Sequence, residues 1–501
     1  MLHKPSAIVI GAGIGGLATA IRLAVQGYTV TVFEKNAYTG GKLAHFSRKG
    51  YHFDEGPSLF TQPQNIEELF ALAGVPMHDY LQYEALPLAC RYFYENGKVV
   101  NAYTNAEAFA NELHTVTGEE PENILAYLRR AEGVYNNIGV LFLHYSLHNK
   151  DILKAPLLKA IQTARPALLF NTLHHLNTSK FSRPETIQLF DRYATYNGSN
   201  PYKAPGMLSL IPHLEQNLGT YYPKGGMISI AKALHALAER VGVQFELNAP
   251  VTKIITEKDR VKGVEVQGTQ HKADVVVSNM DVYFTYKKLL NNAPKSRQIL
   301  KQERSSSAII FYWGIKRNFS QLHLHNIFFS LDYKVEFAHL FELKDFYHDP
   351  TVYINITSKM EPGHAPKGCE NWFVMVNAPA NVGQNWQAFR EQCRTSVLDK
   401  LSRMLKADIE SLIETEEVMD PVIIEEKTAS YMGSLYGTSS NSKLAAFLRH
   451  PNFTPAIKGL YFVGGSVHPG GGIPLCLHSA KLVSNMIHKQ QNVGFVSTTT
   501  P

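Results

Sequence analysis

The strongest constraint on the fold is a glycine-rich turn close to the start of the chain. A short apolar run at 7–10 leads into Gly11, Gly13 and Gly16, and a helix-compatible segment follows at 17–24. This order of strand, tight turn and helix gathers unpaired backbone N–H groups and the positive end of a helix dipole at one point, where they bind phosphate. The sequence therefore predicts the first unit of a dinucleotide-binding α/β domain.

The glycines and the acid that follows them narrow the choice of dinucleotide. Gly11 permits the turn, Gly13 lets the backbone approach a pyrophosphate, and Gly16 allows the helix to pack closely on the strand. A second predicted strand at 29–33 ends in Glu34, the spacing at which an acidic side chain binds ribose hydroxyls. An acid there disfavours the 2′-phosphate of NADP, so FAD and NAD remain as candidates.

Two more glycine turns favour the longer flavin cofactor. They are Gly40-Gly41-Lys42 and Gly56-Pro57-Ser58. Turns this close to the ligand edge of the fold suit an extended cofactor whose flavin end reaches beyond the first domain, so FAD is predicted. Ordinary surface turns are the alternative interpretation of either motif alone.

The far end of the chain carries a second turn of the same kind. A buried-type strand at 460–463 is broken by Gly464 and Gly465, and three glycines at 470–472 precede a predicted helix at 475–486. Such a turn offers backbone donors to an oxyanion such as a flavin carbonyl or a ribityl oxygen. Because the two turns stand at opposite ends of the chain, the cofactor domain is predicted to be discontinuous.

Five motifs occur in order along the chain. They are Gly11-x-Gly13-x-x-Gly16 with Glu34, Gly40-Gly41-Lys42, Phe53-Asp54-x-Gly56-Pro57-Ser58, Tyr222-Pro223-Lys224-Gly225-Gly226-Met227, and Gly464-Gly465-Ser466-x-His468-Pro469-Gly470-x-Gly472-Ile473-Pro474. Together they resemble the motifs of the bacterial carotenoid desaturases, the phytoene desaturase family of amine-oxidase-like flavoproteins. The similarity runs from about residue 6 to about residue 488. The last motif and the segment 192–201 resemble the 1-hydroxycarotenoid 3,4-desaturases more than the phytoene desaturases.

The resemblance implies an FAD-dependent desaturase. It implies that a C=C bond is introduced into an acyclic carotenoid by hydride transfer to flavin N5, at the 3,4-bond of a 1-hydroxycarotenoid, with phytoene as the alternative substrate. It also implies that Val251 meets the adenine side through its backbone. The predicted cofactor-binding residues are Gly11, Gly13, Gly16, Glu34, Lys35, Gly40, Gly41, Lys42, Gly56, Pro57, Ser58, Val251, Gly464, Gly465, Gly472, Ile473 and Pro474.

The sequence offers few candidates for protein-based catalysis. Asp151 and Lys154 resemble an Asp-x-x-Arg pair of related desaturases, with Lys in place of Arg, and an ion pair on one helix face explains their spacing equally well. His468, beside a proline in a tight turn, is more typical of a residue that orders the backbone. The histidines at 174–175 and 323–325 have no carboxylate or cysteine close by in sequence, so no metal site is predicted.

A chain of 501 residues is long enough for two or three lobes. We expect an α/β fold in which a Rossmann-like FAD-binding domain is assembled from discontinuous segments, with an inserted α+β substrate domain and a helical, membrane-facing lid. The predicted FAD-binding segments are 1–100, 220–290 and 421–490. The lid and substrate region is placed at 101–219, the substrate domain at 291–420 and a tail at 491–501.

Composition and charge bear on the partners. The net charge of +6 is small for 501 residues, which argues against a nucleic-acid partner. The scattered cysteines favour a reducing compartment, and neither a signal peptide nor a membrane-spanning run is expected. Between 135 and 180, five basic residues and one acid are interleaved with apolar runs, a pattern typical of peripheral docking on a membrane. We therefore expect a peripheral protein on the cytoplasmic face of a membrane, although internal packing of the apolar faces is the alternative, and the oligomeric state stays open.

Two other functions share the expected architecture. One is an amine oxidase, which would bind the same cofactor. The other is a prenyl-binding escort protein similar to the Rab GDP-dissociation inhibitors, which carries out no redox chemistry. Glu34 and the complete motif at 464–474 favour an enzyme over an escort protein.

Overall fold

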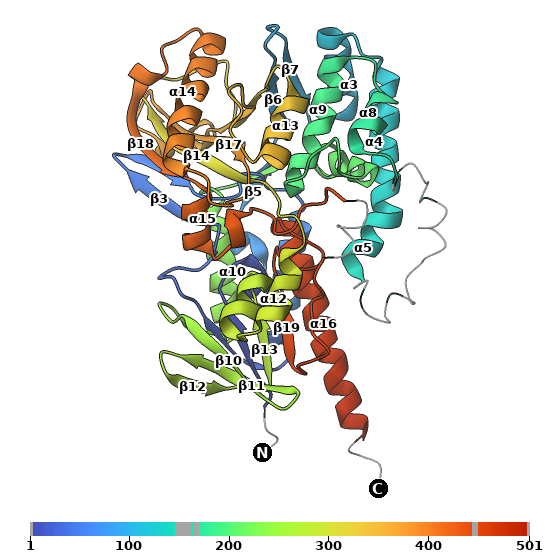
Figure 1. Ribbon diagram of the computed structural model, residues 1–501, viewed down its shortest axis with the longest axis vertical. Helices are drawn as coiled ribbons and strands as arrows, with labels where there is room; N and C mark the ends of the chain where they lie inside the picture. The colour runs from blue at the N-terminus through green and yellow to red at the C-terminus, as the bar shows by residue number, and fades with distance from the viewer. Residues whose placement is uncertain are drawn as a thin grey trace.

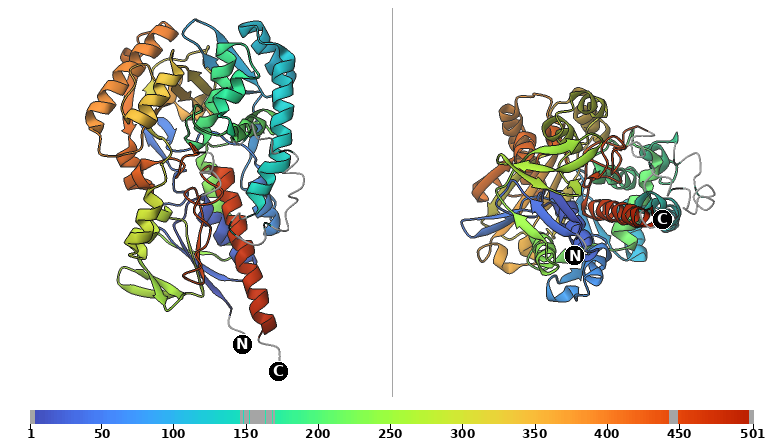
Figure 2. Two further views of the ribbon diagram at one scale, coloured as in Figure 1. Left: turned by 45° about the vertical axis from the view of Figure 1, so that its right-hand side comes forward. Right: turned by 90° about the horizontal axis from the view of Figure 1, so that it is seen from below.

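The computed structural model describes residues 4–145, 170–442 and 449–497, together with the single positions 148, 152, 163 and 168. The molecule is elongated, with one large sheet at each end (Figure 1). The helix α16 (Ile473–Ser497) runs down one side of the lower half (Figure 2). Asp151 and Lys154 lie outside the described residues.

The lower sheet has five parallel strands in the order β19-β13-β1-β2-β9. Its strands are β1 (Ser6–Ile10), β2 (Thr29–Phe33), β9 (Gln244–Glu246), β13 (Val275–Ser278) and β19 (Leu460–Phe462). They come from three stretches of chain that are far apart in sequence. The predicted α/β class with a parallel Rossmann-like sheet is therefore confirmed.

Both faces of this sheet are buried, which explains why β1 is apolar from Ala7 to Ile10. Ala7 and Val9 pack beneath α1 (Ile14–Val25), α10 (Ile228–Arg240) and α16. Ile8 and Ile10 point to the other face, which a three-stranded antiparallel sheet covers. The strands of that small sheet are β10 (Val251–Glu257), β11 (Arg260–Val266) and β12 (Thr269–Lys272).

The upper sheet is mixed and has seven strands in the order β18-β14-β17-β16-β15-β6-β7. They are β6 (Leu88–Phe93), β7 (Val99–Tyr103), β14 (Ser307–Ile315), β15 (His325–Phe328), β16 (Val352–Asn355), β17 (Glu370–Ala378) and β18 (Ile413–Met419). Although β6 lies within the range 1–100 that was expected to belong to the cofactor domain, it pairs in parallel with β15. The first crossing between the two halves of the molecule therefore comes before residue 88.

Helices cover the upper sheet on both faces (Figure 1). On one side lie α3 (Ala106–Thr117), α4 (Pro121–Val134), α8 (Leu173–Thr178) and α9 (Pro184–Asp191), and α4 continues through a π-turn into α5 (Val140–His144). On the other side lies α14 (Trp386–Leu405). The remaining elements are α2 (Gln64–Leu72), α11 (Val282–Phe284), α12 (Ala293–Leu300), α13 (Tyr333–Ala338), α15 (Pro421–Thr428), β3 (His45–Arg48), β4 (Tyr51–Asp54), β5 (Tyr83–Ala85) and β8 (Tyr221–Pro223).

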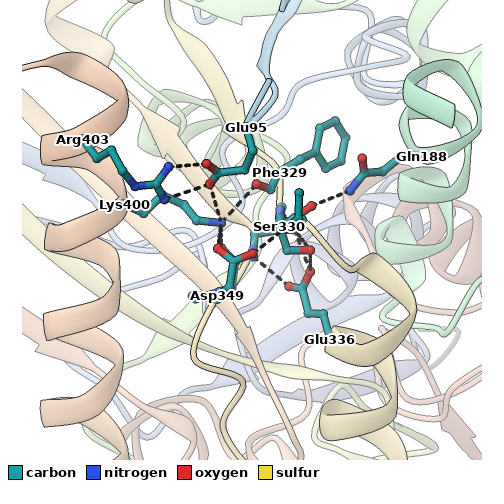
Figure 3. Close-up of polar contacts among 11 residues, drawn as sticks. Glu95, Gln188, Phe329, Ser330, Glu336, Asp349, Lys400 and Arg403 are labelled. Carbon is teal, nitrogen blue, oxygen red and sulfur yellow. Dashed lines mark hydrogen bonds and ion pairs between the residues drawn. The ribbon is translucent and has the colours of Figure 1, made fainter. Parts of the chain in front are cut away.

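A buried lysine ties α14 to this sheet (Figure 3). Lys400 is 2% exposed, and its Nζ donates to the carbonyls of Pro350 (2.7 Å) and Phe329 (3.1 Å) and pairs with Asp349 (2.6 Å). The neighbouring Glu336 of α13 accepts hydrogen bonds from Ser330 and Thr351. A buried charge is tolerated only when it is paired and hydrogen-bonded, so this cluster holds α13 and α14 in register with the loops of the sheet.

Within the part of the chain that the structure describes, no helix is both long and apolar enough to cross a membrane. The four cysteines are free thiols.

Candidate active site

The predicted glycine turns stack on one another, and each contact leaves no room for a side chain. A Cβ atom at Gly16 would lie 2.1 Å from the Gly11 carbonyl oxygen, and one at Gly41 would lie 3.1 Å from the Cα of Gly13. At Gly56 a Cβ atom would lie 1.9 Å from a carbonyl oxygen of the turn at 40–42. Real Cβ atoms do not approach a carbonyl oxygen that closely, so the three N-terminal turns need glycine in order to form one continuous surface.

The C-terminal turn joins this surface from the opposite end of the sequence. A side chain at position 464 would clash with Asn279, because its Cβ atom would lie 2.6 Å from Oδ1 of Asn279. Asn279 follows β13 directly, and its Nδ2 donates to the Gly11 carbonyl at 3.4 Å. The helix α16 begins at Ile473, so its N-terminal N–H groups and dipole are aimed at the same place. Asn279 was missed by the sequence motifs, although its position at the end of a parallel strand marks it as a residue of the ligand edge.

Glu34 directly follows β2 and is 5% exposed. Its Oε2 accepts from the N–H of Ala12 (2.7 Å) and its Oε1 from the N–H of Asn36 (2.9 Å). A carboxylate has about four acceptor positions, so each oxygen can accept a further bond from a ribose hydroxyl. The carboxylate is therefore held in place by the backbone and still able to bind a ligand.

A single cavity of about 530 Å³ connects these elements, a size typical of a small-molecule or cofactor site. Every predicted cofactor residue lines it except Gly16, which packs behind the turn against Gly11. Lys42 lines the cavity and donates from Nζ to the Leu435 carbonyl at 2.8 Å. Burial lowers the pKa of Lys42 from its usual value, although Asp281 opposes the shift.

The cavity continues from the glycine turns onto the seven-stranded sheet. Its floor there is made of apolar side chains from neighbouring strands, among them Ile310, Ile327, Phe373, Met375 and Met419. An apolar floor of this kind suits a hydrocarbon, because burial of apolar surface is the main favourable term in its binding. The site thus joins a polar, backbone-lined end to an apolar, side-chain-lined end.

Two hydrogen-bonded clusters of polar side chains lie at the apolar end, and sequence reasoning missed both. The first surrounds Glu215, which accepts from Arg192 at 3.1 Å and from Tyr193 at 3.0 Å and is also bonded to Tyr196. Burial alone would raise the pKa of Glu215, but the Arg192 guanidinium and the tyrosine hydroxyls outweigh it and hold the pKa below its usual value. Glu215 is therefore ionised and fully compensated.

The second polar group is a chain of hydrogen bonds from the cofactor end to the sheet. Ser58 Oγ lies 2.7 Å from the hydroxyl of Tyr353, which lies 2.7 Å from Nδ1 of His325. Burial lowers the pKa of His325 to about 4, so the ring is neutral at physiological pH. All three residues line the cavity.

The other histidines singled out in the sequence play different parts. His468 is buried and does not line the cavity; its ring nitrogen Nε2 lies 3.2 Å from the Tyr145 carbonyl, which supports a backbone-ordering role. His174 has a carboxylate partner, Asp191, at 2.6 Å that its sequence neighbours did not reveal. Over 4–145, 170–442 and 449–497, no group of three or more metal-ligating side chains comes together.

The sequence of this chain is similar to those of known proteins. The sequence profile described as flavin containing amine oxidoreductase matches residues 14–488. The chain is 51% identical over 482 residues to a 1-hydroxycarotenoid 3,4-desaturase of Flavobacterium sp. (strain P99-3), covering 96% of this chain and 98% of that protein. It is 33% identical over 491 residues to a 4,4′-diapolycopene oxygenase of Methylomonas sp, covering 96% and 97%.

Solved structures share the fold. Cyclohexylamine oxidase from Brevibacterium oxydans IH-35A superposes with a TM-score of 0.62 at 15% identity, covering 98% of this chain and 100% of that one. An oxidoreductase from Methanosarcina mazei gives a TM-score of 0.62 at 17% identity, covering 96% and 100%. The chain therefore belongs to the flavin containing amine oxidoreductases, in the group that includes the carotenoid desaturases and oxygenases, and it uses a flavin cofactor.

Proposed function

We propose that this protein is an FAD-dependent desaturase that introduces the 3,4 C=C bond into a 1-hydroxycarotenoid. The observation that carries the proposal is the 51% identity to a 1-hydroxycarotenoid 3,4-desaturase over 96% of the chain. The continuous cavity supports it, because an apolar sheet floor meets the glycine turns without an intervening wall.

FAD is the flavin that best fits the residues present. Glu34 and Val251 line one end of the cavity, and the turn at 464–474 lines another part of it. FMN lacks an adenosine ribose and would leave the Glu34 carboxylate without that ligand. Heat release and chromatography of the flavin from the purified protein test this point, and recovery of FMN alone would contradict it.

A flavin held by these residues would supply the acceptor for one substrate hydrogen as hydride, and the other hydrogen would leave as a proton. The chain's own residues would orient and shield the reacting carbons. The apolar floor on β14, β15, β17 and β18 would hold the polyene and exclude water, which keeps the reactive centre dry. The predicted cofactor residues at 40–42 and 56–58 would help to hold the flavin.

We propose further that the predicted lid docks on the cytoplasmic face of a membrane, from which a lipid-soluble carotenoid must enter. The support is the pattern of basic and apolar residues at 135–180. Replacing Lys150, Lys154 and Lys159 together with alanine should lower sedimentation with anionic liposomes. Unchanged sedimentation would contradict membrane docking while leaving the proposed reaction intact.

The proposed reaction is tested by offering phytoene, lycopene and a 1-hydroxylated carotene in parallel to the purified protein in liposomes. We expect the hydroxylated carotene to be desaturated and to bleach the flavin under anaerobic conditions, whereas an amine should not bleach it. Conversion of phytoene alone would overturn the choice of substrate. In the same assay, Asp151→Asn should slow single-turnover flavin reduction if Asp151 and Lys154 handle the proton.

A further inference from the structure

His325 is a polar residue in the apolar floor of the cavity. A pure hydrocarbon ligand could not form a hydrogen bond with its ring. It stands at the start of β15, is 2% exposed, and lines the cavity beside Ile327. Its Nδ1 is engaged by Tyr353, but its Nε2 has no hydrogen-bond partner among the described residues. Buried polar atoms in native proteins are rarely left without a partner, so an unpartnered ring nitrogen in a cavity wall points to a ligand.

The neighbours of His325 decide which ring nitrogen carries the proton. Asn355 Nδ2 donates to the Leu324 carbonyl at 3.1 Å and also lies 3.2 Å from Nδ1 of His325. An amide nitrogen only donates, so Nδ1 must be an acceptor. Because burial keeps the ring neutral by lowering its pKa, the single proton resides on Nε2. His325 therefore presents a donor, not an acceptor, to whatever lies against it.

The place of this donor along the cavity restricts the ligand group it can meet. Tyr353 connects His325 to Ser58, which belongs to the turn at 56–58 at the predicted flavin end. In a 1-hydroxylated chain the hydroxyl is carried by C1, which is two C–C bonds from C3, so its oxygen lies only about 4 Å from the bond to be oxidised. The group that binds this hydroxyl must therefore adjoin the predicted flavin end of the cavity, to which His325 is connected through Tyr353 and then Ser58.

The Glu215 cluster is a second group of polar side chains on the cavity, and its carboxylate is already satisfied. Arg192, Tyr193, Tyr196 and Gln216 all direct donors at this one carboxylate. Since the acceptor positions of a carboxylate number about four, the set is closed. This cluster is better suited to holding the wall in shape than to binding a further hydroxyl.

We propose that Nε2–H of His325 donates a hydrogen bond to the hydroxyl of a 1-hydroxycarotenoid and thereby selects the hydroxylated substrate. Tyr353 and Ser58 are positioning residues that hold the ring in this tautomer and orientation. The inference rests on the proposed function, because it names a residue that recognises the proposed substrate. A carotene without the hydroxyl leaves this N–H unpaired, and sites built around such a donor discriminate strongly against the analogue that lacks the partner.

The test compares His325→Leu, His325→Gln and the exposed His323→Leu as the matched control. Binding of a 1-hydroxylated carotene and of its deoxygenated counterpart is measured from the change in carotenoid absorbance with dithionite-reduced holoenzyme, which cannot turn over. Roughly tenfold tighter binding of the hydroxylated ligand is expected for the unmodified protein. His325→Leu should bring this ratio close to one by weakening the hydroxylated ligand alone, and His325→Gln should keep part of it because the amide still donates. His323→Leu should leave it unchanged.

Measurements of turnover and flavin content distinguish a failure of the role proposed for His325 from a failure of the proposed function. With oxidised enzyme, His325→Leu should raise KM for the hydroxylated carotene more than it lowers kcat, with an unaltered flavin spectrum. Equal losses for both carotenes, or an unchanged preference in His325→Leu, would overturn the role of His325. If the unmodified protein binds the hydroxylated carotene tightly but never desaturates it, the proposed function fails instead. Tyr353→Phe provides a second variant, for which we expect an intermediate loss of preference.

Discussion

The two ends of the cavity are built by different means. One end, called here the cofactor end because it is predicted to bind the flavin, is made of backbone. Its glycine turns around Gly16, Gly41, Gly56 and Gly464 leave little or no room for side chains. The sheet end is made of single side chains, such as His325 and Tyr353, contributed by strands that are far apart in sequence. Substitutions at the first end should therefore act through the fold and flavin binding, whereas substitutions at the second should act through substrate binding.

The largest effect is expected at the cofactor end from Gly16→Val. The new side chain would overlap the Gly11 carbonyl and separate α1 from β1, because neither backbone segment can move independently. We expect the variant to lose flavin during purification, with at least a hundredfold weaker binding in reconstitution. Gly133→Ala is the matched control, because a Cβ atom at that helical glycine meets nothing within 4 Å. Full flavin content in Gly16→Val would contradict the close-packing argument.

A large loss of stability is expected outside both ends from Lys400→Met. Removing the ammonium takes the buried donor away from the carbonyls of Pro350 and Phe329 and the counter-charge away from the partly exposed Asp349. Leaving a buried acceptor unsatisfied typically costs about 1–3 kcal/mol. Chemical unfolding of the flavin-loaded protein measures the loss. The exposed Lys316→Met should change the free energy of unfolding by less than about 0.5 kcal/mol. A similar small change in Lys400→Met would show that the cluster in Figure 3 contributes little.

Acid should destabilise the protein through buried neutral histidines. Burial lowers the pKa of His325, His450 and His468 to about 4, whereas an unfolded chain has a histidine pKa of about 6.5. Between these values the unfolded chain binds more protons, so stability is full above about pH 6.5 and falls as the pH drops toward 4. Between pH 7 and pH 5 the loss is up to roughly 2 kcal/mol per histidine. Urea unfolding at the two pH values measures it, and His468→Gln should reduce the difference.

The smallest effect is expected from Glu34→Gln. The amide keeps one acceptor for the N–H of Ala12 or Asn36 but loses the charge and an acceptor for ribose, so FAD should bind roughly tenfold more weakly. Fluorescence titration of the flavin-free protein with FAD and with FMN measures the affinity for each flavin. FMN lacks the adenosine ribose, so its affinity should not change. An equal loss for both flavins would mean that Glu34 acts only by ordering the turn.

The glycine turns that line the cavity could be predicted from the sequence because their signals are local, and their role in binding the cofactor stays a prediction. A strand, a glycine turn and a helix within about 20 residues leave few other folds open, and Glu34 follows at the spacing set by one βαβ unit. Val251 was predicted as a cofactor-binding residue from the family resemblance alone, and it lines the cavity in the structure. The part of the prediction that concerns Asp151 and Lys154 stays a prediction, since both lie outside the described residues.

The sheet end could not be predicted in the same way. Alternation of apolar residues indicates a strand but does not identify the neighbouring strand. The pairing of β6 with β15 therefore could not be predicted from the sequence. His325 was noted from the sequence only as one of two nearby histidines. The residues around it in the sequence did not predict that it lies beside Tyr353 or close to Ser58. His174 was likewise separated in sequence from Asp191.

The sequence by itself therefore determined the nucleotide-binding unit, the flavin class and the discontinuity of the cofactor domain. These depend on backbone conformations that only glycine allows and on spacings within single supersecondary units. The tertiary structure alone decided which side chains form the floor and the polar wall of the cavity. That choice depends on long-range strand pairing, which brings residues 58, 325 and 353 within hydrogen-bonding distance although hundreds of residues separate the first from the others.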